Sequence, residues 1–282
     1  MISTEQAIAK ASAKSADATT APAPRAETSL LHRQSSDGQT VVHVDLDALR
    51  AAGLLPEAAQ ERRMAEQFRA IKRTVLQKLR AVTATQKPID GANMLLVTSA
   101  LPGDGKSFTA VNLAFSIARE HDVSLVLLDA DVVKRHVSRA FGLESTHGLL
   151  DALADASIDV EACIRRTSVP GLSVLPVGTA HEHAAELLSS TRMRAILSRI
   201  GRDSSRLLLA DSMPLLLSSD AVVLAQMARQ IVLVVRSGVT PQGAVQEAIS
   251  QINKDKLAGL VLNENDMPSF NQYYGYGMYG VT

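Results

Sequence analysis

The chain has 282 residues, 46% of them hydrophobic, and its 29 basic residues are balanced by 29 acidic ones. This zero net charge argues against a dedicated nucleic-acid-binding protein, which normally carries a basic excess. The single cysteine, Cys163, excludes an internal disulfide and fits a reducing cytosol, and no apolar run approaches the roughly 18 residues needed to span a bilayer.

The N-terminal part divides into two predicted segments. Residues 1–38 are rich in Ala, Ser, Thr and Pro, a composition typical of a disordered arm. Residues 39–60 are predicted to form a short docking segment with a strand-like piece at Val41–Val44. The chain begins without the apolar stretch of a signal peptide, so we expect a soluble, cytoplasmic protein that reaches a membrane only through a partner.

A strong helix is predicted over residues 61–83. Its apolar residues, such as Phe68, Ile71 and Val75, recur every three or four positions. The opposite face is basic, which suits either a solvated surface or a contact with another subunit. The basic residues of that face are Arg62, Arg69, Lys72, Arg73, Lys78 and Arg80.

Short apolar strands alternate with amphipathic helices from residue 93 onward, and we place the domain at residues 61–265. This pattern predicts an α/β fold with a doubly wound, mostly parallel sheet and helices on both faces, which binds ligands at the carboxyl ends of its strands. The predicted strands are Met94–Ser99, Leu125–Asp131, Leu172–Val177, Leu207–Asp211, Ile231–Val235 and Leu260–Asn263. The predicted helices are Ser107–Arg119, Ala184–Ile200, Ser219–Ala228 and Pro241–Ile252.

A phosphate-binding loop is predicted at Ala100–Ser107. The segment has the P-loop spacing [AG]-x4-G-K-[ST] and lies between a strand and a helix, as that motif requires. Gly103 and Gly105 allow backbone N–H groups to surround the phosphates, Lys106 supplies positive charge, and the Ser107 hydroxyl is a ligand for Mg²⁺. The sequence therefore predicts ATP and Mg²⁺ as cofactors.

Carboxylates lie at the ends of two predicted strands. Asp129 and Asp131 are two residues apart, so on a strand they share one face and can both point to the P-loop. One of them can activate a nucleophile while both help to hold Mg²⁺, although Asp131 also suits a helix cap or a turn. Asp211 closes a third apolar strand, the position of a Walker B carboxylate that reaches Mg²⁺ directly or through water.

All four tyrosines lie in the last ten residues, at Tyr273, Tyr274, Tyr276 and Tyr279. Core tyrosines would be scattered along the chain, and the glycines between these four oppose both helix and packed strand. We predict that residues 266–282 are a flexible tail whose phenols accept phosphoryl groups. The alternative is a tail that only docks on a partner.

With these motifs the chain resembles the bacterial tyrosine kinases, which are P-loop kinases of the deviant-Walker class related to the ATPases that position chromosomes and division sites. The resemblance covers about residues 60–282. It rests on Ser99–Ser107 (Walker A), Leu127–Asp131 (Walker A′), Asp211–Pro214 (Walker B), Ala185–Ser190 and the tyrosine tail. The details look closest to the stand-alone tyrosine autokinases of exosortase-linked exopolysaccharide systems, as in Phe68–Arg73 and Gly259–Asn263.

The resemblance implies roles for individual residues. Asp129 would be the base or the Mg²⁺ organiser, Asp131 and Asp211 would have metal roles, and Asn263 would contact adenine unless it simply ends a strand. The ATP γ-phosphoryl group would pass to the tail tyrosines between neighbouring subunits. The implied nucleotide-binding set is Pro102, Gly103, Asp104, Gly105, Lys106, Ser107, Phe108 and Asn263.

Partners are also implied by the resemblance. The oligomerisation helix of the family reads E-x-x-R-x-x-R, and the match here is Glu66, Arg69 and Lys72, with Arg73 adjacent. Lysine cannot reproduce the bidentate contact of a guanidinium, so a ring-shaped octamer is only suggested. The other implied partners are an inner-membrane chain-length or co-polymerase protein that activates the kinase and a protein-tyrosine phosphatase.

Two departures from the family pattern leave other functions open. Met213 replaces the first proline of the usual D-x-P-P, and Val132–Arg135 stands where R-P is usual. One alternative function is an ATP-driven positioning switch, although such relatives often have an extra lysine near Leu101 and need no tyrosine tail. The other is a non-catalytic nucleotide-binding scaffold of a polysaccharide export complex.

Overall fold

The computed structural model describes residues 33–34, 40–85, 93–201, 203 and 205–264, all within the unit His32–Thr282. The predicted tyrosine tail lies outside these residues, as does most of the predicted N-terminal arm. Arg33–Gln34, inside that arm, form strand β1 and pair in antiparallel fashion with β2 (Thr40–Val41).

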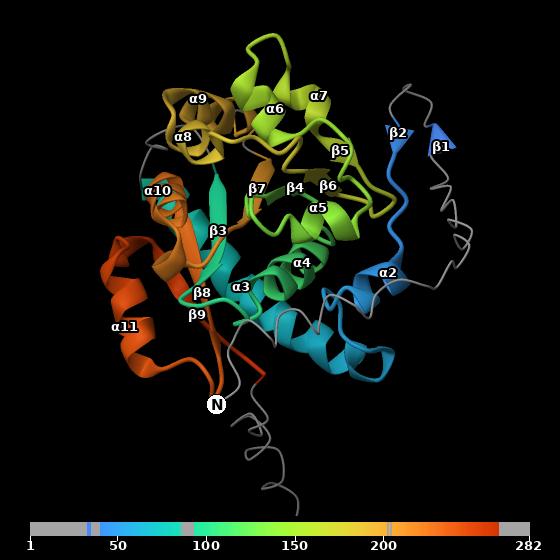
Figure 1. Cartoon of the computed structure of the whole chain (residues 1–282). Coiled ribbons are helices and arrows are strands. Elements are labelled where there is room, and N and C mark those ends of the chain that lie inside the picture. Colours follow the sequence, from blue (N-terminus) through green and yellow to red (C-terminus); the bar gives the residue numbers. More distant parts are fainter. Residues whose placement is uncertain (1–32, 35–39, 86–92, 202, 204, 265–282) are drawn as a thin grey trace, which may run out of the picture. The chain divides into compact units, whose positions relative to one another are not determined.

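A seven-stranded sheet forms the centre of the described part, in the order β5-β6-β4-β7-β3-β8-β9 (Figure 1). All neighbouring strands are parallel except the edge pair β5–β6. The first long strand, β3, lies inside the sheet, and later strands add on both of its sides, so the predicted doubly wound fold is confirmed. The bounds are β3 Met94–Ser99, β4 Ser124–Asp129, β5 Arg165–Arg166, β6 Leu172–Leu175, β7 Arg206–Asp211, β8 Gln230–Arg236 and β9 Leu257–Asn263.

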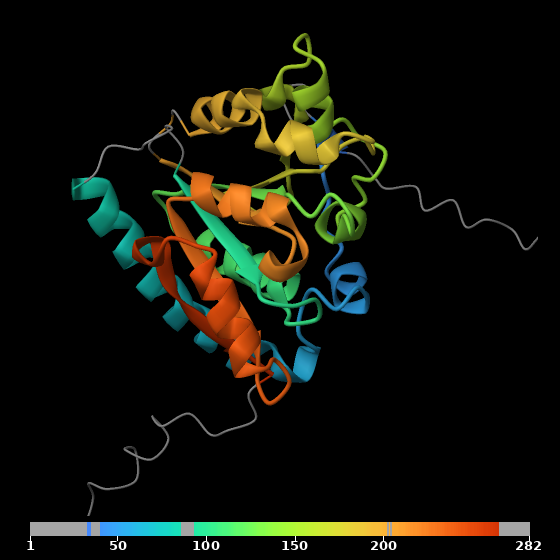
Figure 2. The ribbon, with the colours of Figure 1, turned by 60° about the vertical axis from the view of Figure 1, so that its left-hand side comes forward.

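Each face of the sheet is buried by its own set of helices, because side chains alternate between the two faces of a strand. On β3, Met94 and Leu96 belong to a core formed with α6–α11, whereas Leu95 and Val97 belong to a core formed with α2–α5. Figures 1 and 2 show α3 and α10 on opposite sides of the sheet. The bounds are α2 Leu46–Ala51, α3 Glu61–Thr85, α4 Lys106–Ile117, α5 His136–Ala140, α6 Leu149–Ala154, α7 Val160–Cys163, α8 Ala184–Ser189, α9 Thr191–Ile200, α10 Ser219–Met227 and α11 Gln242–Ser250.

The prediction of one helix over Ala184–Ile200 is wrong, because α8 and α9 are separate helices that meet at Ser190. The Ser190 hydroxyl accepts a hydrogen bond from the amide of Met193 (3.2 Å), which caps the start of α9. The short helices α5, α6 and α7 and the edge strand β5 were not predicted, because each is too short to show a hydrophobic period.

The N-terminal segment after β2 docks on the domain that follows it. The amide of Val42 donates to the carbonyl oxygen of Arg166 (2.8 Å), and the amide of Ser168 donates to that of Val42 (2.9 Å). Leu49 of α2 and Leu54 are fully buried in the core formed with α3 and α4. The partner of the predicted docking segment is thus the chain's own sheet edge, and the compact fold starts earlier than residue 61.

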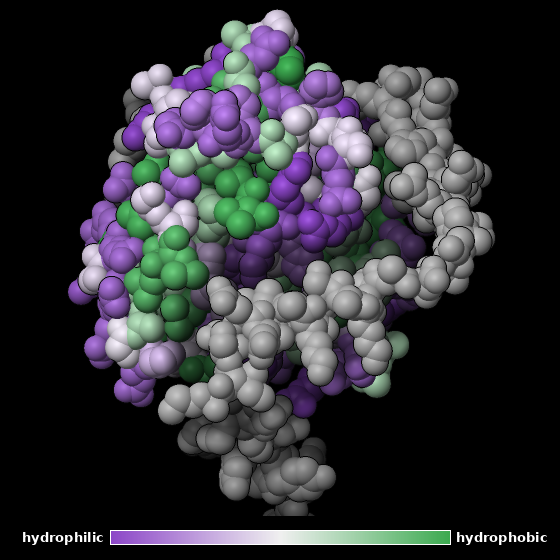
Figure 3. Space-filling view, in the orientation of Figure 1, coloured by the Kyte–Doolittle hydropathy of each residue, from purple (hydrophilic) through white to green (hydrophobic). Residues whose placement is uncertain are grey.

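The helices in the described ranges are too short or too polar to cross a bilayer. On the face seen in Figure 3, hydrophobic side chains form separate patches between hydrophilic ones.

Candidate active site

The phosphate-binding loop connects β3 to α4 at the carboxyl edge of the sheet. Gly103 and Gly105 have φ angles of 87° and 92°, in the left-handed region that only glycine enters without strain. A Cβ atom on Gly105 would overlap the side-chain amide of Asn263. The two glycines of the motif are therefore required by the backbone path, and the second also by the close approach of β9.

Asp104 stabilises this loop from within. Its carboxylate accepts hydrogen bonds from the amide of Leu101 (3.0 Å) and from the hydroxyl of Thr240 (2.6 Å), and its side chain is buried. The side-chain amide of Asn263 donates to the Asp104 carbonyl oxygen (3.1 Å). Asp104 and Asn263, both predicted to contact the nucleotide, here bond to other parts of the protein and fix the shape of the loop.

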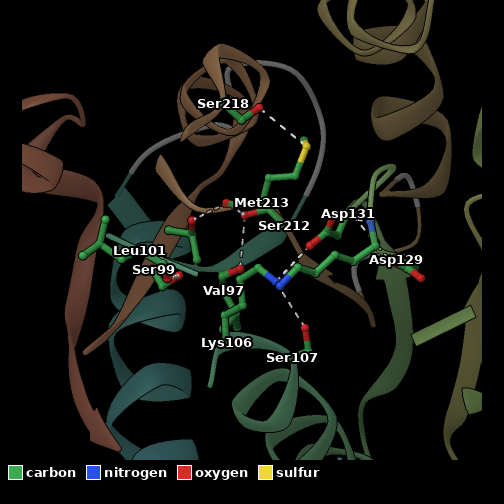
Figure 4. Close-up of polar contacts among 12 residues, drawn as sticks. Val97, Ser99, Leu101, Lys106, Ser107, Asp129, Asp131, Ser212, Met213 and Ser218 are labelled. Carbon is green, nitrogen blue, oxygen red and sulfur yellow. Dashed lines mark hydrogen bonds and ion pairs between the residues drawn. The ribbon is translucent and has the colours of Figure 1, made fainter. Parts of the chain in front are cut away.

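Lys106 lies in a buried cluster of charges. Its Nζ is 2.9 Å from Asp131 Oδ2 and 3.4 Å from the Ser107 hydroxyl (Figure 4). The side chains of Lys106 and Asp131 are only 9% and 2% exposed. Burial acts to lower the pKa of Lys106, but the charges of Asp211 and Asp131 outweigh burial and raise it. The lysine is therefore cationic at neutral pH.

Asp129 is fully buried at the end of β4 and is held by Ser138 of α5. Asp129 Oδ2 accepts hydrogen bonds from the amide and the hydroxyl of Ser138, both at 2.7 Å. Asp129 Oδ1 accepts only a longer bond, of 3.2 Å, from the amide of Asp131. Burial raises the pKa of Asp129 to about 6, although the bonds from Ser138 oppose this effect. Ser138, which no sequence motif marked, thus orients a predicted catalytic carboxylate.

Asp211 pairs in register with Asp129 across β7 and β4. It is fully buried, and no described group meets hydrogen-bond geometry with either carboxylate oxygen, although the Ser107 hydroxyl is near enough to lower its pKa. Burial raises the pKa of Asp211 to about 7, against the lowering effect of the Lys106 charge. Buried carboxylate oxygens without partners are costly, so this site is built for a cation or for water.

The residues present fit Mg²⁺ bound together with a nucleotide. Among the described residues, no three His, Cys, Asp or Glu side chains converge as a ready-made metal cluster. Mg²⁺ does not require such a cluster, since it usually binds one or two carboxylates together with waters and substrate phosphates. Asp211, Asp131 and the Ser107 hydroxyl are the groups that would hold it.

Met213, which departs from the family's Walker B pattern, is packed without displacing Asp211. Its carbonyl oxygen accepts from the Thr98 hydroxyl (2.9 Å), and its sulfur lies 3.5 Å from the Ser218 hydroxyl (Figure 4). The amide of Ser212 donates to the carbonyl oxygen of Val97, so the segment stays attached to β3. The methionine side chain is thus buried at the position where the family usually has proline.

The other departure, Val132–Arg135, forms a turn closed by Asp131. The Asp131 carboxylate accepts from the amide of Lys134 (2.9 Å), and the amide of Arg135 donates to the Asp131 carbonyl oxygen (2.8 Å). Arg135 has a φ of 52°, which is strained for a non-glycine residue. Asp131 therefore closes a turn, as the alternative interpretation predicted, and also contacts Lys106.

The predicted oligomerisation residues lie on α3. Glu66, Arg69 and Arg73 are exposed, whereas Lys72 is bonded to Glu120 of the same chain. The predicted phosphoacceptors Tyr273, Tyr274, Tyr276 and Tyr279 lie outside the described residues. The last described strand, β9, ends at Asn263, which bonds to the phosphate loop.

Comparisons with known proteins place the chain in a family, although no family model matches it. The tyrosine-protein kinase YwqD of Bacillus subtilis (strain 168) is 33% identical over 215 residues, which cover 75% of this chain and 86% of that protein. The chain belongs to the bacterial tyrosine kinases. EpsB of Ralstonia solanacearum is 34% identical over 193 residues, or 67% of this chain, but the match spans only 25% of EpsB.

Solved structures agree with this membership. The BceF tyrosine kinase domain has a TM-score of 0.61 and 28% identity, covering 78% of this chain and 86% of that one. The cell division ATPase MinD of Pyrococcus furiosus has a TM-score of 0.50 and 21% identity, covering 62% of this chain and 74% of that one, and shows a shared fold. The resemblance to bacterial tyrosine kinases and the P-loop ATPase fold are both confirmed.

Proposed function

We propose that this bacterial tyrosine kinase transfers the ATP γ-phosphoryl group to its own C-terminal tyrosines. The observation that carries the proposal is the hydrogen bond between Asn263 and Asp104, which holds a residue ten positions before Tyr273 against the phosphate loop. A chain that worked only as an ATP-driven switch would have no use for four clustered phenols. The buried charges of Lys106, Asp131 and Asp211 support phosphoryl transfer as the chemistry.

In this mechanism the residues position the reacting groups and stabilise their negative charge, because phosphoryl transfer requires little covalent chemistry from the protein. Lys106 exchanges its contact with Asp131 for the β- and γ-phosphates, and the amides around Gly103 and Gly105 bind the same groups. Mg²⁺, when bound, would neutralise charge on the β- and γ-phosphate oxygens. Asp131, Asp211 and Ser107 would hold it.

Asp129 accepts or orients the phenol proton of the attacking tyrosine. With a pKa near 6 it is largely ionised at neutral pH, and its Oδ1 keeps the capacity to accept a proton. Ser138 fixes the carboxylate in one orientation. The O–P bond to the tyrosine forms as the bond to ADP breaks, and the proton leaves with the base.

The cellular setting follows from the resemblance and is also proposed. The kinase would form a homo-oligomer through α3, phosphorylate tails between neighbours and regulate exopolysaccharide synthesis and export. It would act in the cytoplasm, recruited to the inner face of the membrane by a chain-length or co-polymerase protein, and a tyrosine phosphatase would reverse its action.

The test is to incubate the purified chain with Mg²⁺-ATP and map phosphate by mass spectrometry. We expect phosphate on Tyr273, Tyr274, Tyr276 or Tyr279, and its loss in Lys106→Met. Lys254→Met, which removes an exposed lysine, is the matched control and should behave as the parent chain. Undiminished tail phosphorylation in Lys106→Met would refute the assignment. Hydrolysis of ATP without phosphotyrosine would favour the switch, and nucleotide binding without either reaction would favour the scaffold.

A further inference from the structure

Helix α3 forms one wall of a groove that the proposed reaction does not use. The groove consists of two adjoining hollows, of about 590 and 430 Å³, and Arg69 and Lys72 line both. We refer to the two together as the α3 groove. The larger hollow has an apolar floor that includes Met64, Phe68 and Phe115.

The smaller hollow is strongly basic. Its lining includes Arg69, Arg73 and Arg80, all exposed, together with Lys72. Among the described residues that line it, Glu120 is the one acid, and Glu120 is already bonded to Lys72. Three guanidinium charges thus remain in excess at one end of an apolar groove.

We propose that the α3 groove binds the tyrosine-phosphorylated C-terminal tail of this chain. Guanidinium groups bind phosphate through paired hydrogen bonds, and an apolar hollow beside them suits the phenyl ring that carries the phosphate. Phosphotyrosine combines these two features, whereas a free phosphate or a phosphoserine offers only one. The proposal rests on the proposed kinase function, which supplies the modified tyrosines.

Charge complementarity selects the tail as the occupant. Residues 265–282 contain no Lys or Arg, one acidic residue, Asp266, and all four tyrosines of the chain. Each phosphate adds about −1.5 to −2 charges at neutral pH, so modification turns a nearly neutral segment into a strongly anionic one. The unmodified tail has little reason to bind arginines, and the groove therefore distinguishes the two states.

A phosphorylated tail bound in the α3 groove would affect oligomerisation. Arg69 and Arg73 belong to the surface of α3 that is proposed to contact a neighbouring subunit. A phosphorylated tail bound there competes with that neighbour for the same guanidinium groups. Phosphorylation would then weaken the oligomer by occupying its interface as well as by repulsion between tails.

The binding test uses the full chain, treated with phosphatase and kept without ATP. A fluorescein-labelled peptide of residues 265–282, phosphorylated on the four tyrosines, is titrated by fluorescence anisotropy. We expect it to bind at least about tenfold more tightly than the unphosphorylated peptide, and more weakly as salt rises. A peptide with phosphoserine at the four positions should bind less tightly than the phosphotyrosine peptide, since it lacks the rings.

Charge-reversal variants locate the site. Arg73→Glu combined with Arg80→Glu should weaken phosphopeptide binding at least about tenfold. Arg63→Glu reverses an exposed arginine of the same helix that lines neither hollow, and should leave binding within about twofold. Circular dichroism checks that each variant is folded, and Arg80→Glu alone serves if the double variant is not.

Equal affinity for the phosphorylated and unphosphorylated peptides would overturn the proposal. Equal loss of affinity in Arg63→Glu and in the groove variants would also overturn the proposal. It would show that the affinity depends on the net charge of the protein and not on the α3 groove. The peptide is synthetic, so a chain that failed to phosphorylate itself could still bind it. Failure of the groove and failure of the kinase assignment are thus distinguishable.

Discussion

The ammonium of Lys106 lies 2.9 Å from the Asp131 carboxylate, and both groups are almost completely buried. This contact neutralises Lys106, so under the proposed mechanism a nucleotide would have to compete with Asp131 for the ammonium group. The ion pair joins the Walker A loop to the segment that follows β4, so two motifs more than twenty residues apart act as one unit.

Replacing Asp131 with Asn keeps the shape of the side chain and removes its charge. We expect the rate of tail phosphorylation to fall by about 10²-fold, because preorganised charge at the transferred group is lost. ATP affinity should be retained or improved, since Lys106 is no longer held by the carboxylate. Separate measurement of kcat and of ATP binding checks both parts, with exposed Asp155→Asn as the control. An unchanged kcat would remove Asp131 from the mechanism.

Asp211→Asn should inactivate the kinase and at the same time stabilise the fold. The aspartate is fully buried, and its raised pKa shows that burial outweighs the attraction of Lys106, so replacing its charge with a neutral group removes a net cost. We expect up to about 4 kcal/mol of added stability at pH 7.5 without Mg²⁺, because the raised pKa of Asp211 reports a cost of about 1.4 kcal/mol per pKa unit for its charged form. Urea unfolding measures this difference. A destabilised Asp211→Asn would contradict the view that Asp211 is kept for catalysis at the expense of stability.

The stabilisation by Asp211→Asn should depend on pH. Burial raises the pKa of Asp211 to about 7, above its value of about 3.9 in an unfolded chain. The folded state therefore holds more protons than the unfolded state between those values, and its stability falls as pH rises through them. Asn cannot titrate, so the free energy of unfolding of Asp211→Asn should exceed that of the parent chain by an amount that grows from pH 5 to pH 7.5. Burial also raises the pKa of Asp129 to about 6, which acts in the same direction as Asp211, and lowers the pKa of His136, which acts oppositely; both groups titrate in both proteins. A constant difference across this interval would disprove the assigned titration.

Gly105→Ala should abolish nucleotide binding, because the new Cβ would overlap Asn263 and the residue would be strained at a φ of 92°. Asn263→Ala should have a milder effect and raise the KM for ATP several-fold, since one hydrogen bond to the loop is lost. The double variant relieves the overlap but not the backbone strain, so it should regain little. Full recovery in the double variant would show that the overlap alone, and not the left-handed backbone, requires glycine.

The sequence predicted those parts of the site that depend on local spacing. The P-loop, the pair Asp129 and Asp131, and Asp211 at the end of β7 each follow from a strand and the residues beside it, and β3 was predicted with its observed bounds. The long-range contacts were not predictable. Ser138 bonding to Asp129 and Thr240 bonding to Asp104 join segments that only the fold brings together.

The N-terminal segment illustrates the same limit. Its strand-like pattern at Val41–Val44 suggested a docking element, and in the structure Val42 bonds to Arg166 of the chain's own edge strand β5. A pattern in a single sequence shows that the apolar face of an element must be buried, but it does not show which segment buries it. The predicted adenine contact of Asn263 stays a prediction, and its observed bond to Asp104 shows that the residue has a second task within the loop.

Under the proposed autophosphorylation, covalent attachment of the tail to β9 at Asn263 would determine the local concentration of acceptor tyrosines. From Glu264 to Tyr273 the chain can extend at most about 30 Å. Covalent attachment over such a distance corresponds to an effective concentration on the order of millimolar. A free peptide of the same sequence would have to reach that concentration to compete. Within an assembly, dilution of the protein would leave the supply of acceptor tyrosines unchanged.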